Sequence, residues 1–175
     1  MPNLYLTEGA GKARNASGMI FENLIHRICN DNGYEARKND YKKTEEIEGI
    51  SLKNLQVDNH IYQHNVMKKA SECKTYLDSC YLKRAVIDFI ELNNSPEVPD
   101  DVEYAIIAGQ ECVSKDSLNY YCAYFKKMTG KEVKIFIINK FKKRNAKKAI
   151  YMKKFNDDFQ LDIQEVEEFV KWLKK

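Results

Sequence analysis

Two short apolar runs set the strongest limit on how this chain can fold. Residues 105–108 read Ala-Ile-Ile-Ala, and residues 135–138 read Ile-Phe-Ile-Ile. Runs this short are typical of buried strands, and they fall well below the roughly 18 apolar residues of a membrane span. Between them, residues 115–128 carry apolar side chains at helical spacing. A strand, a helix and a second strand therefore predict a layered α/β fold.

The rest of the chain predicts further helices and strands. Helices are expected over about 16–32, from Asp78 to about 92, and over about 162–174. Strands are expected within 35–49, over 55–62, over 70–76 with 63–69 as a connection, and around the two apolar runs, over 103–109 and 132–139. The order α, β, β, β, α, β, α, β, α predicts a mixed α/β fold with a central mixed β-sheet flanked by helices.

Composition narrows the class of protein. The chain has 175 residues, 43% of them hydrophobic, which fits one domain (1–175) with a real core rather than a disordered chain. An odd number of cysteines, 5, with no CxxC spacing favours a reducing cytoplasm. The formal net charge of +3 does not by itself indicate a nucleic-acid binder.

Three charged residues on neighbouring predicted strands carry the chemistry. Glu72 and Lys74 are two apart on one strand, so their side chains share a face. Asp58 lies on the preceding strand, and a hairpin would bring the two carboxylates and the ammonium together. Paired carboxylates hold a hard divalent cation such as Mg²⁺, which acidifies a bound water. The lysine could orient or deprotonate that water, or stabilise negative charge on a phosphate.

This pattern resembles the PD-(D/E)XK nuclease superfamily, with Val57 where the superfamily's name has proline. The resemblance includes the element order over about 16–139 and adds Glu22, a glutamate on the first helix that would support the metal site. It implies a restriction-endonuclease-like core, a Mg²⁺ site at Asp58 and Glu72 that Mn²⁺ could also fill, and a type II restriction enzyme that cuts double-stranded DNA. It further implies a homodimer and a cognate DNA methyltransferase. A Holliday-junction resolvase or repair nickase on the same fold stays open.

A basic segment follows the last predicted strand. Residues 140–154 carry eight basic and no acidic side chains, so the rest of the chain sums to −5. Such a segment can neutralise phosphates. The expected DNA contacts are Lys140, Lys142, Lys143, Arg144, Lys147 and Lys148. Alternatively, the segment is a solvated basic face, or the whole chain is a non-catalytic DNA-binding protein.

Two histidines and the polar side of the 115–128 helix give weaker functional signals. His60 and His64, with Cys73 and Cys80 nearby, could suggest zinc, but i, i+4 spacing on a strand does not bring two imidazoles together. His60 shares the face of Asp58 and could lie close to DNA. On the 115–128 helix, Asn119, Tyr120 and Tyr124 could form a dimer surface or a recognition surface.

Overall fold

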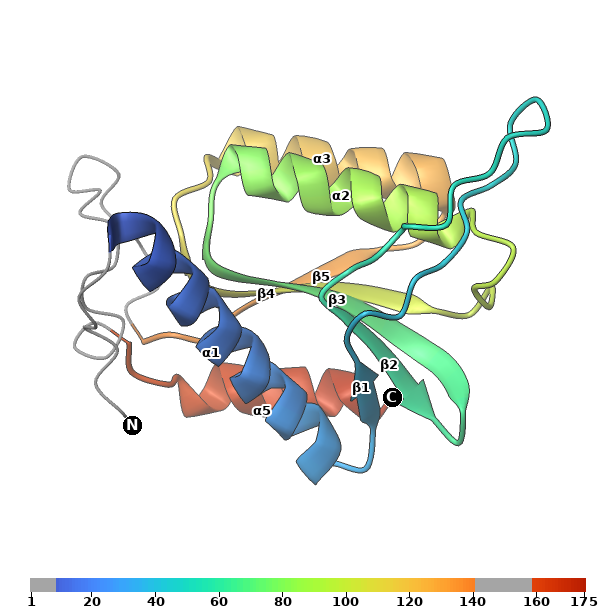
Figure 1. Ribbon diagram of the computed structural model, residues 1–175. Coiled ribbons are helices and arrows are strands. Elements are labelled where there is room, and N and C mark those ends of the chain that lie inside the picture. The colour runs from blue at the N-terminus through green and yellow to red at the C-terminus, as the bar shows by residue number, and fades with distance from the viewer. Residues whose placement is uncertain (1–8, 141–158) are drawn as a thin grey trace.

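The strands of this protein form a mixed sheet with helices on both faces (Figure 1). The computed structural model describes residues 9–140 and 159–175. In chain order the elements are α1 (Gly9–Asp31), β1 (Glu35–Arg37), β2 (Asn59–Gln63), β3 (Val66–Leu77), α2 (Ser79–Asn93), β4 (Glu103–Glu111), α3 (Lys115–Thr129), β5 (Val133–Ile137) and α5 (Ile163–Leu173). The predicted order of helices and strands is confirmed.

The sheet has five strands in the order β1-β2-β3-β4-β5. β2 runs antiparallel to both β1 and β3, whereas β4 and β5 run parallel to β3. Parallel neighbours need a crossover, and α2 and α3 supply the two crossovers. The predicted mixed α/β fold with a central mixed sheet is therefore confirmed for the described residues.

The hairpin between β2 and β3 differs from the sequence prediction. His64 and Asn65 have positive φ values of 50° and 61°, so the chain reverses within two residues. The predicted connection over 63–69 is wrong, because residues 66–69 already belong to β3. The predicted strand over 55–62 also begins late, since β2 starts at Asn59.

Each face of the sheet is covered by its own pair of helices (Figure 1). On one face, α2 and α3 pack against a core that includes Phe89, Tyr104 and Phe125. On the other, α1 and α5 pack against a core that includes Phe21 and Trp172. Because both faces are buried, β4 is apolar along most of its length, as the run at 105–108 predicted.

Helix ends follow local capping chemistry. Asp78 begins α2 by accepting a hydrogen bond from the backbone N–H of Tyr81, and Asp162 begins α5 by accepting from those of Gln164 and Glu165. Gly130 ends α3 with a left-handed φ of 74°. None of the described helices is long and apolar enough to cross a membrane.

The long segment between β1 and β2 contains a β-ribbon that the sequence did not predict. Residues 42–55, here called the arm, are held by bridges between Lys42 and Leu55 and between Ile47 and Ile50. The arm projects beyond the helices at the upper right of Figure 1. The segment read from the sequence as a weak strand and a loop is therefore a short strand followed by a projecting hairpin.

Candidate functional site

Asp58 lies immediately before β2 and faces β3. Its neighbour Asn59 pairs with Ser71, which brings Asp58 opposite the next residues of β3. The Asp58 carboxylate oxygen Oδ2 accepts a hydrogen bond from the backbone N–H of Cys73 at 2.8 Å and from the Lys74 ammonium at 3.0 Å. The carboxylate is thus fixed by main chain as well as by side chain.

Glu72 and Lys74 project from β3 toward Asp58, as the strand alternation predicted. Lys74 Nζ lies 2.5 Å from Glu72 Oε2, and Glu72 is 5% exposed. Cys73, between them, is buried in the core formed with α1 and α5. The pleat of β3 therefore holds two charged groups at one side while packing the residue between them at the other.

The charges in this cluster do not balance. Two carboxylates share the single Lys74 ammonium, and the cluster is largely buried. Burial, together with the negative charge of Asp58, raises the pKa of Glu72 to about 8 despite the opposing effect of Lys74. For Lys74, burial lowers the pKa, but Glu72 and Asp58 outweigh it and the net shift is upward. Lys74 is therefore protonated at neutral pH.

Glu22 approaches the cluster from α1 without being its direct partner. Its carboxylate pairs with Lys38, whose Nζ lies 3.6 Å from Glu22 Oε2. Burial raises the pKa of Glu22, and the charge of Asp58 raises it further, while Lys38 and Lys74 act in the opposite direction. The charges of Asp58 and Lys74 thus change the pKa of Glu22, which lies at the border of the cluster.

Asp88 on α2 is a bordering residue that sequence reasoning missed. Burial raises its pKa, Arg84 and Lys74 lower it, and Asp58 raises it. Its carboxylate lies 3.6 Å from the Nε of Arg84, one helical turn away. The i, i+4 spacing of Arg84 and Asp88 was the available signal, but only the crossover from β3 to α2 brings this helix face near Asp58.

Cation ligands in this cluster would be carboxylate oxygens. Asp58 and Glu72 provide them, and no group of three or more His, Cys, Asp or Glu side chains able to hold a metal occurs among the described residues. Two carboxylates are the usual protein contribution to a Mg²⁺ site, with water and substrate phosphate completing the ion's shell. The donor set therefore fits Mg²⁺, which would displace the proton that Glu72 holds at neutral pH.

The predicted DNA-binding segment lies almost entirely outside the described residues. Of its six named residues, Lys140 is described. It is exposed and follows the short bridge between Asn139 and Leu161. The other five lie outside the described residues: Lys142, Lys143, Arg144, Lys147 and Lys148.

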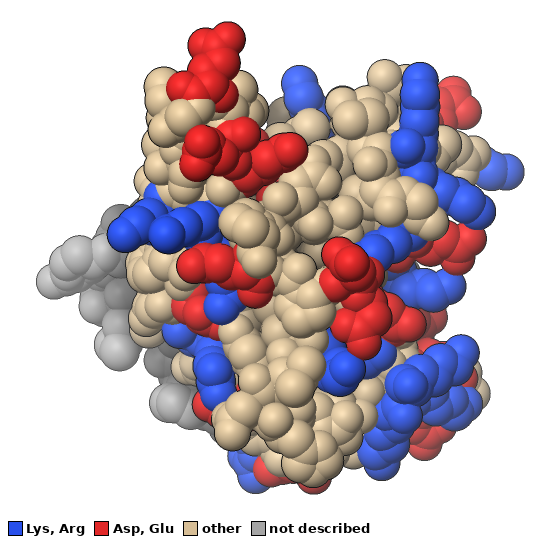
Figure 2. Space-filling view, turned by 90° about the vertical axis from the view of Figure 1, so that its right-hand side faces the viewer, with Lys and Arg blue, Asp and Glu red and all other residues tan. Residues whose placement is uncertain are grey.

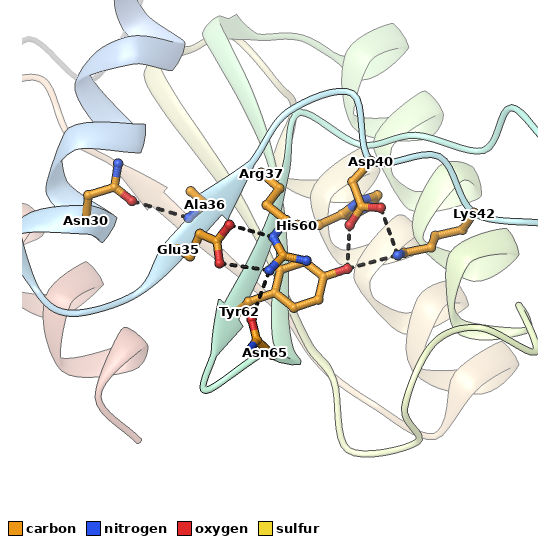
Figure 3. A network of polar contacts seen from close by, with 9 residues as sticks. All are labelled: Asn30, Glu35, Ala36, Arg37, Asp40, Lys42, His60, Tyr62 and Asn65. Carbon is orange, nitrogen blue, oxygen red and sulfur yellow. Dashed lines mark hydrogen bonds and ion pairs between the residues drawn. The ribbon is translucent and has the colours of Figure 1, made fainter.

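A second polar network lies at the other end of β2, and His60 lies against it (Figure 3). The Tyr62 hydroxyl donates to Asp40, and Lys42 Nζ donates to Asp40 Oδ1 and to the Tyr62 hydroxyl, both at 2.9 Å. His60 Nδ1 lies 3.3 Å from Asp40 Oδ2.

His60 is fully buried, and burial lowers its pKa to about 4. The prediction that it could lie close to DNA is therefore wrong, because the chain that follows β1 covers it. His64 lies in the hairpin turn, so it and His60 do not form a pair on one face.

Comparison with known proteins gives no assignment. No protein-family model matches the chain, and no curated protein matches it significantly. Functional conclusions therefore depend on the residues and distances of the site.

Proposed function

We propose that this chain is a Mg²⁺-dependent endonuclease of the PD-(D/E)XK type that hydrolyses phosphodiester bonds in double-stranded DNA, as a sequence-specific type II restriction enzyme does. The observation that carries the proposal is the meeting of Asp58, Glu72 and Lys74 in one buried cluster. The order of helices and strands around the cluster is also the order that the resemblance implies.

Asp58 and Glu72 would hold the metal ion. Lys74 can neutralise only one of the two carboxylates, and a second buried negative charge is costly unless a proton or a cation neutralises it. The raised pKa of Glu72 means that a proton does so at neutral pH, and a bound cation would take the place of that proton. Bound Mg²⁺ would supply positive charge at the scissile phosphate and lower the pKa of a coordinated water. Mn²⁺ accepts the same oxygen ligands and is expected to substitute.

Lys74 would position the attacking water and stabilise negative charge on the phosphate. Its upward pKa shift keeps it protonated, so in this state it donates hydrogen bonds and does not act as a base. Asp58 and Glu72 fix the position of its ammonium from two sides. Glu22 would support the site through its charge, with Lys38 holding it in place.

The basic segment and the family resemblance extend the proposal to partners. Residues 140–154 would neutralise the DNA backbone flanking the cleaved bond. A homodimer would place two such sites on a two-fold symmetric DNA sequence, and a cognate methyltransferase would protect the host's own copies. Such an enzyme would act in the cytoplasm.

Digestion of sequenced linear DNA with and without Mg²⁺ tests the proposal. The wild type is compared with Asp58→Asn and with Asp101→Asn, a matched control because Asp101 also accepts a hydrogen bond from a lysine, Lys68, at 3.0 Å. We expect discrete fragments that require Mg²⁺, persist in Asp101→Asn and disappear in Asp58→Asn. No cleavage by the wild type, or full activity of Asp58→Asn, would contradict the site assignment.

A synthetic four-way junction in the same assay separates the alternatives. Selective cutting of the junction would keep the chemistry but replace restriction by junction resolution. Salt-sensitive DNA binding with no Mg²⁺-dependent cleavage would indicate a non-catalytic DNA-binding protein.

A further inference from the structure

The tip of the arm is a defined hairpin. Ile47 and Ile50 exchange two backbone hydrogen bonds of 3.0 and 2.9 Å. Glu48 and Gly49 between them have φ values of 52° and 80°, the pattern of a tight two-residue turn. Thr44 and Leu52 add further bonds along the ribbon. The side chains at the tip are therefore presented on a fixed scaffold.

Apolar side chains of the arm are not covered by the described parts of the chain, 9–140 and 159–175. Ile47 is 69% exposed, Ile50 67% and Leu52 57%, and Tyr41 at the base is also exposed. Isoleucine side chains that are exposed to water do not stabilise the fold of a projecting ribbon. Exposed apolar groups gathered in one place mark interaction surfaces.

The charge of the tip indicates the kind of partner. Glu45, Glu46 and Glu48 surround the isoleucines, and all three are exposed. Acidic side chains gather at the upper end of the face shown in Figure 2, the end at which the arm projects in Figure 1. Such a tip repels the phosphates of DNA and suits a surface that is both apolar and basic.

The outer side of α3 is such a surface. Tyr120 is 65% exposed, and its ring stacks on that of Tyr124 with centroids 6.3 Å apart and planes within 2° of parallel. Met128 is 47% exposed on the same helix. Lys127, exposed in its last turn, supplies positive charge beside these apolar groups, whereas Lys126 is paired with Glu132 at 3.2 Å.

We propose that this protein forms a two-fold dimer in which the arm tip of each chain packs on the outer face of α3 of the other. Ile47 and Ile50 would contact the stacked tyrosines, and the glutamates of the tip would face Lys127. A reciprocal contact of this kind closes after two copies, so it yields a dimer and no larger polymer. Tyrosine and methionine are enriched at such interfaces. The dimer surface does not depend on the chemistry of the cluster at Asp58.

Sedimentation equilibrium of the full chain over a range of concentrations tests the dimer. The double variant Ile47→Asp/Ile50→Asp should weaken dimerisation by at least about tenfold. Ile163→Asp is the matched control, because Ile163 is 59% exposed at the start of α5, away from both surfaces. It should dimerise as the wild type does. A monomeric wild type, or a dimer that the double variant leaves intact, would overturn the proposal.

Charge reversal tests which surface the arm meets. Glu45→Lys/Glu46→Lys alone, and Lys127→Glu alone, should each weaken the dimer. A mixture of the two variants should form heterodimers, because one arm contact is then charge-reversed on both sides and the other is native, and the combined triple variant should recover dimerisation. Failure of both combinations to recover would overturn the pairing of the arm with α3. Because these measurements need no DNA and no Mg²⁺, their failure would remove the dimer from the proposed function but leave the proposed chemistry at Asp58 untouched, and loss of that chemistry would leave the dimer untouched.

Discussion

Two polar clusters flank the short strand β2, and they differ in how their charges are matched. In each, a carboxylate accepts a hydrogen bond from a lysine, Asp58 from Lys74 at 3.0 Å and Asp40 from Lys42 at 2.9 Å. The Asp58 cluster adds a second carboxylate, Glu72, whereas the Asp40 cluster adds a tyrosine hydroxyl that donates to its carboxylate. In the first cluster Lys74 can neutralise only one of two carboxylates, so Glu72 holds a proton up to about pH 8, whereas in the second the single carboxylate is matched by its partners.

The pKa shifts follow this difference. Burial and Asp58 raise the pKa of Glu72 to about 8. Burial also acts to raise the pKa of Asp40, but hydrogen bonds from Tyr62 and Lys42 outweigh it, so the net shift is downward. A carboxylate whose charge is satisfied stabilises a fold, and one whose charge is not satisfied is a candidate for binding or catalysis. The two clusters therefore separate a structural use of aspartate and lysine from a proposed functional use.

Replacing the lysine of each cluster gives the largest expected difference between the two clusters. We expect Lys74→Met to lower the Mg²⁺-dependent cleavage rate by at least about a hundredfold, because the phosphate loses its fixed cation. Lys42→Met should keep the rate per folded molecule. Single-turnover cleavage of a DNA fragment measures both. Equal losses in the two variants, or no loss in Lys74→Met, would remove the distinction between the clusters.

The pH dependence of the free energy of unfolding gives the next largest expected difference between the two clusters. The raised pKa of Glu72 means that the folded protein holds a proton the unfolded chain loses near pH 4.5, so the wild type loses stability as pH rises from about 4.5 to 8. Glu72→Gln lacks this loss. Urea unfolding in EDTA should show equal stability near pH 4 and an advantage of a few kcal/mol for the variant near pH 9. Parallel curves of unfolding free energy against pH for the two proteins would contradict the raised pKa of Glu72.

The Asp40 cluster should respond in the opposite direction. Asp40→Ala should lower the free energy of unfolding by about 2 kcal/mol, because the Tyr62 hydroxyl and the Lys42 ammonium lose their acceptor. The lowered pKa of Asp40 means that its stabilisation is present above pH 3.8 and is lost as pH falls through the folded-state value. The difference between variant and wild type in urea should therefore shrink in acid. A constant difference would argue against an ionised Asp40.

The smallest effect is expected from one hydroxyl. Tyr62→Phe keeps the ring on which the Arg37 guanidinium stacks at 3.9 Å. It removes the hydroxyl that donates to Asp40 and accepts from Lys42, while Asp40 and Lys42 keep their bond to each other. A loss of about 1 kcal/mol is expected from thermal or urea unfolding. Tyr41→Phe is the control, because Tyr41 is 54% exposed. If both variants lose the same amount, the Tyr62 bond contributes nothing specific.

The meeting of Asp58, Glu72 and Lys74 could be predicted because it depends on local rules. Side chains on a strand alternate, and consecutive strands joined by a short turn pair with each other. Neither rule needs knowledge of distant residues. The same alternation along β3 puts Cys73 on the opposite side of the sheet, in the core.

The residues that sequence reasoning misplaced depend on distant parts of the chain. His60 is buried because the segment after β1 folds back and brings Asp40 within 3.3 Å of it. Asp88 borders the candidate site only because the crossover orients α2 toward Asp58. Trp172 was not predicted in the core, but it packs beside Phe136 and Lys69. Alternation and helical spacing carry no information about such long-range placement.

One contact in the site has a consequence for how the protein can change over generations. The hydrogen bond from the Cys73 backbone N–H to Asp58 comes from the main chain. Mutation at position 73 can exchange the side chain for any other, and the donor persists in every case but proline, which has no N–H. One substitution removes the Lys74 ammonium, yet the backbone hydrogen bond to Asp58 persists for as long as β3 keeps its course. A lineage could therefore lose its chemistry and still retain the anchored carboxylate as a trace of it.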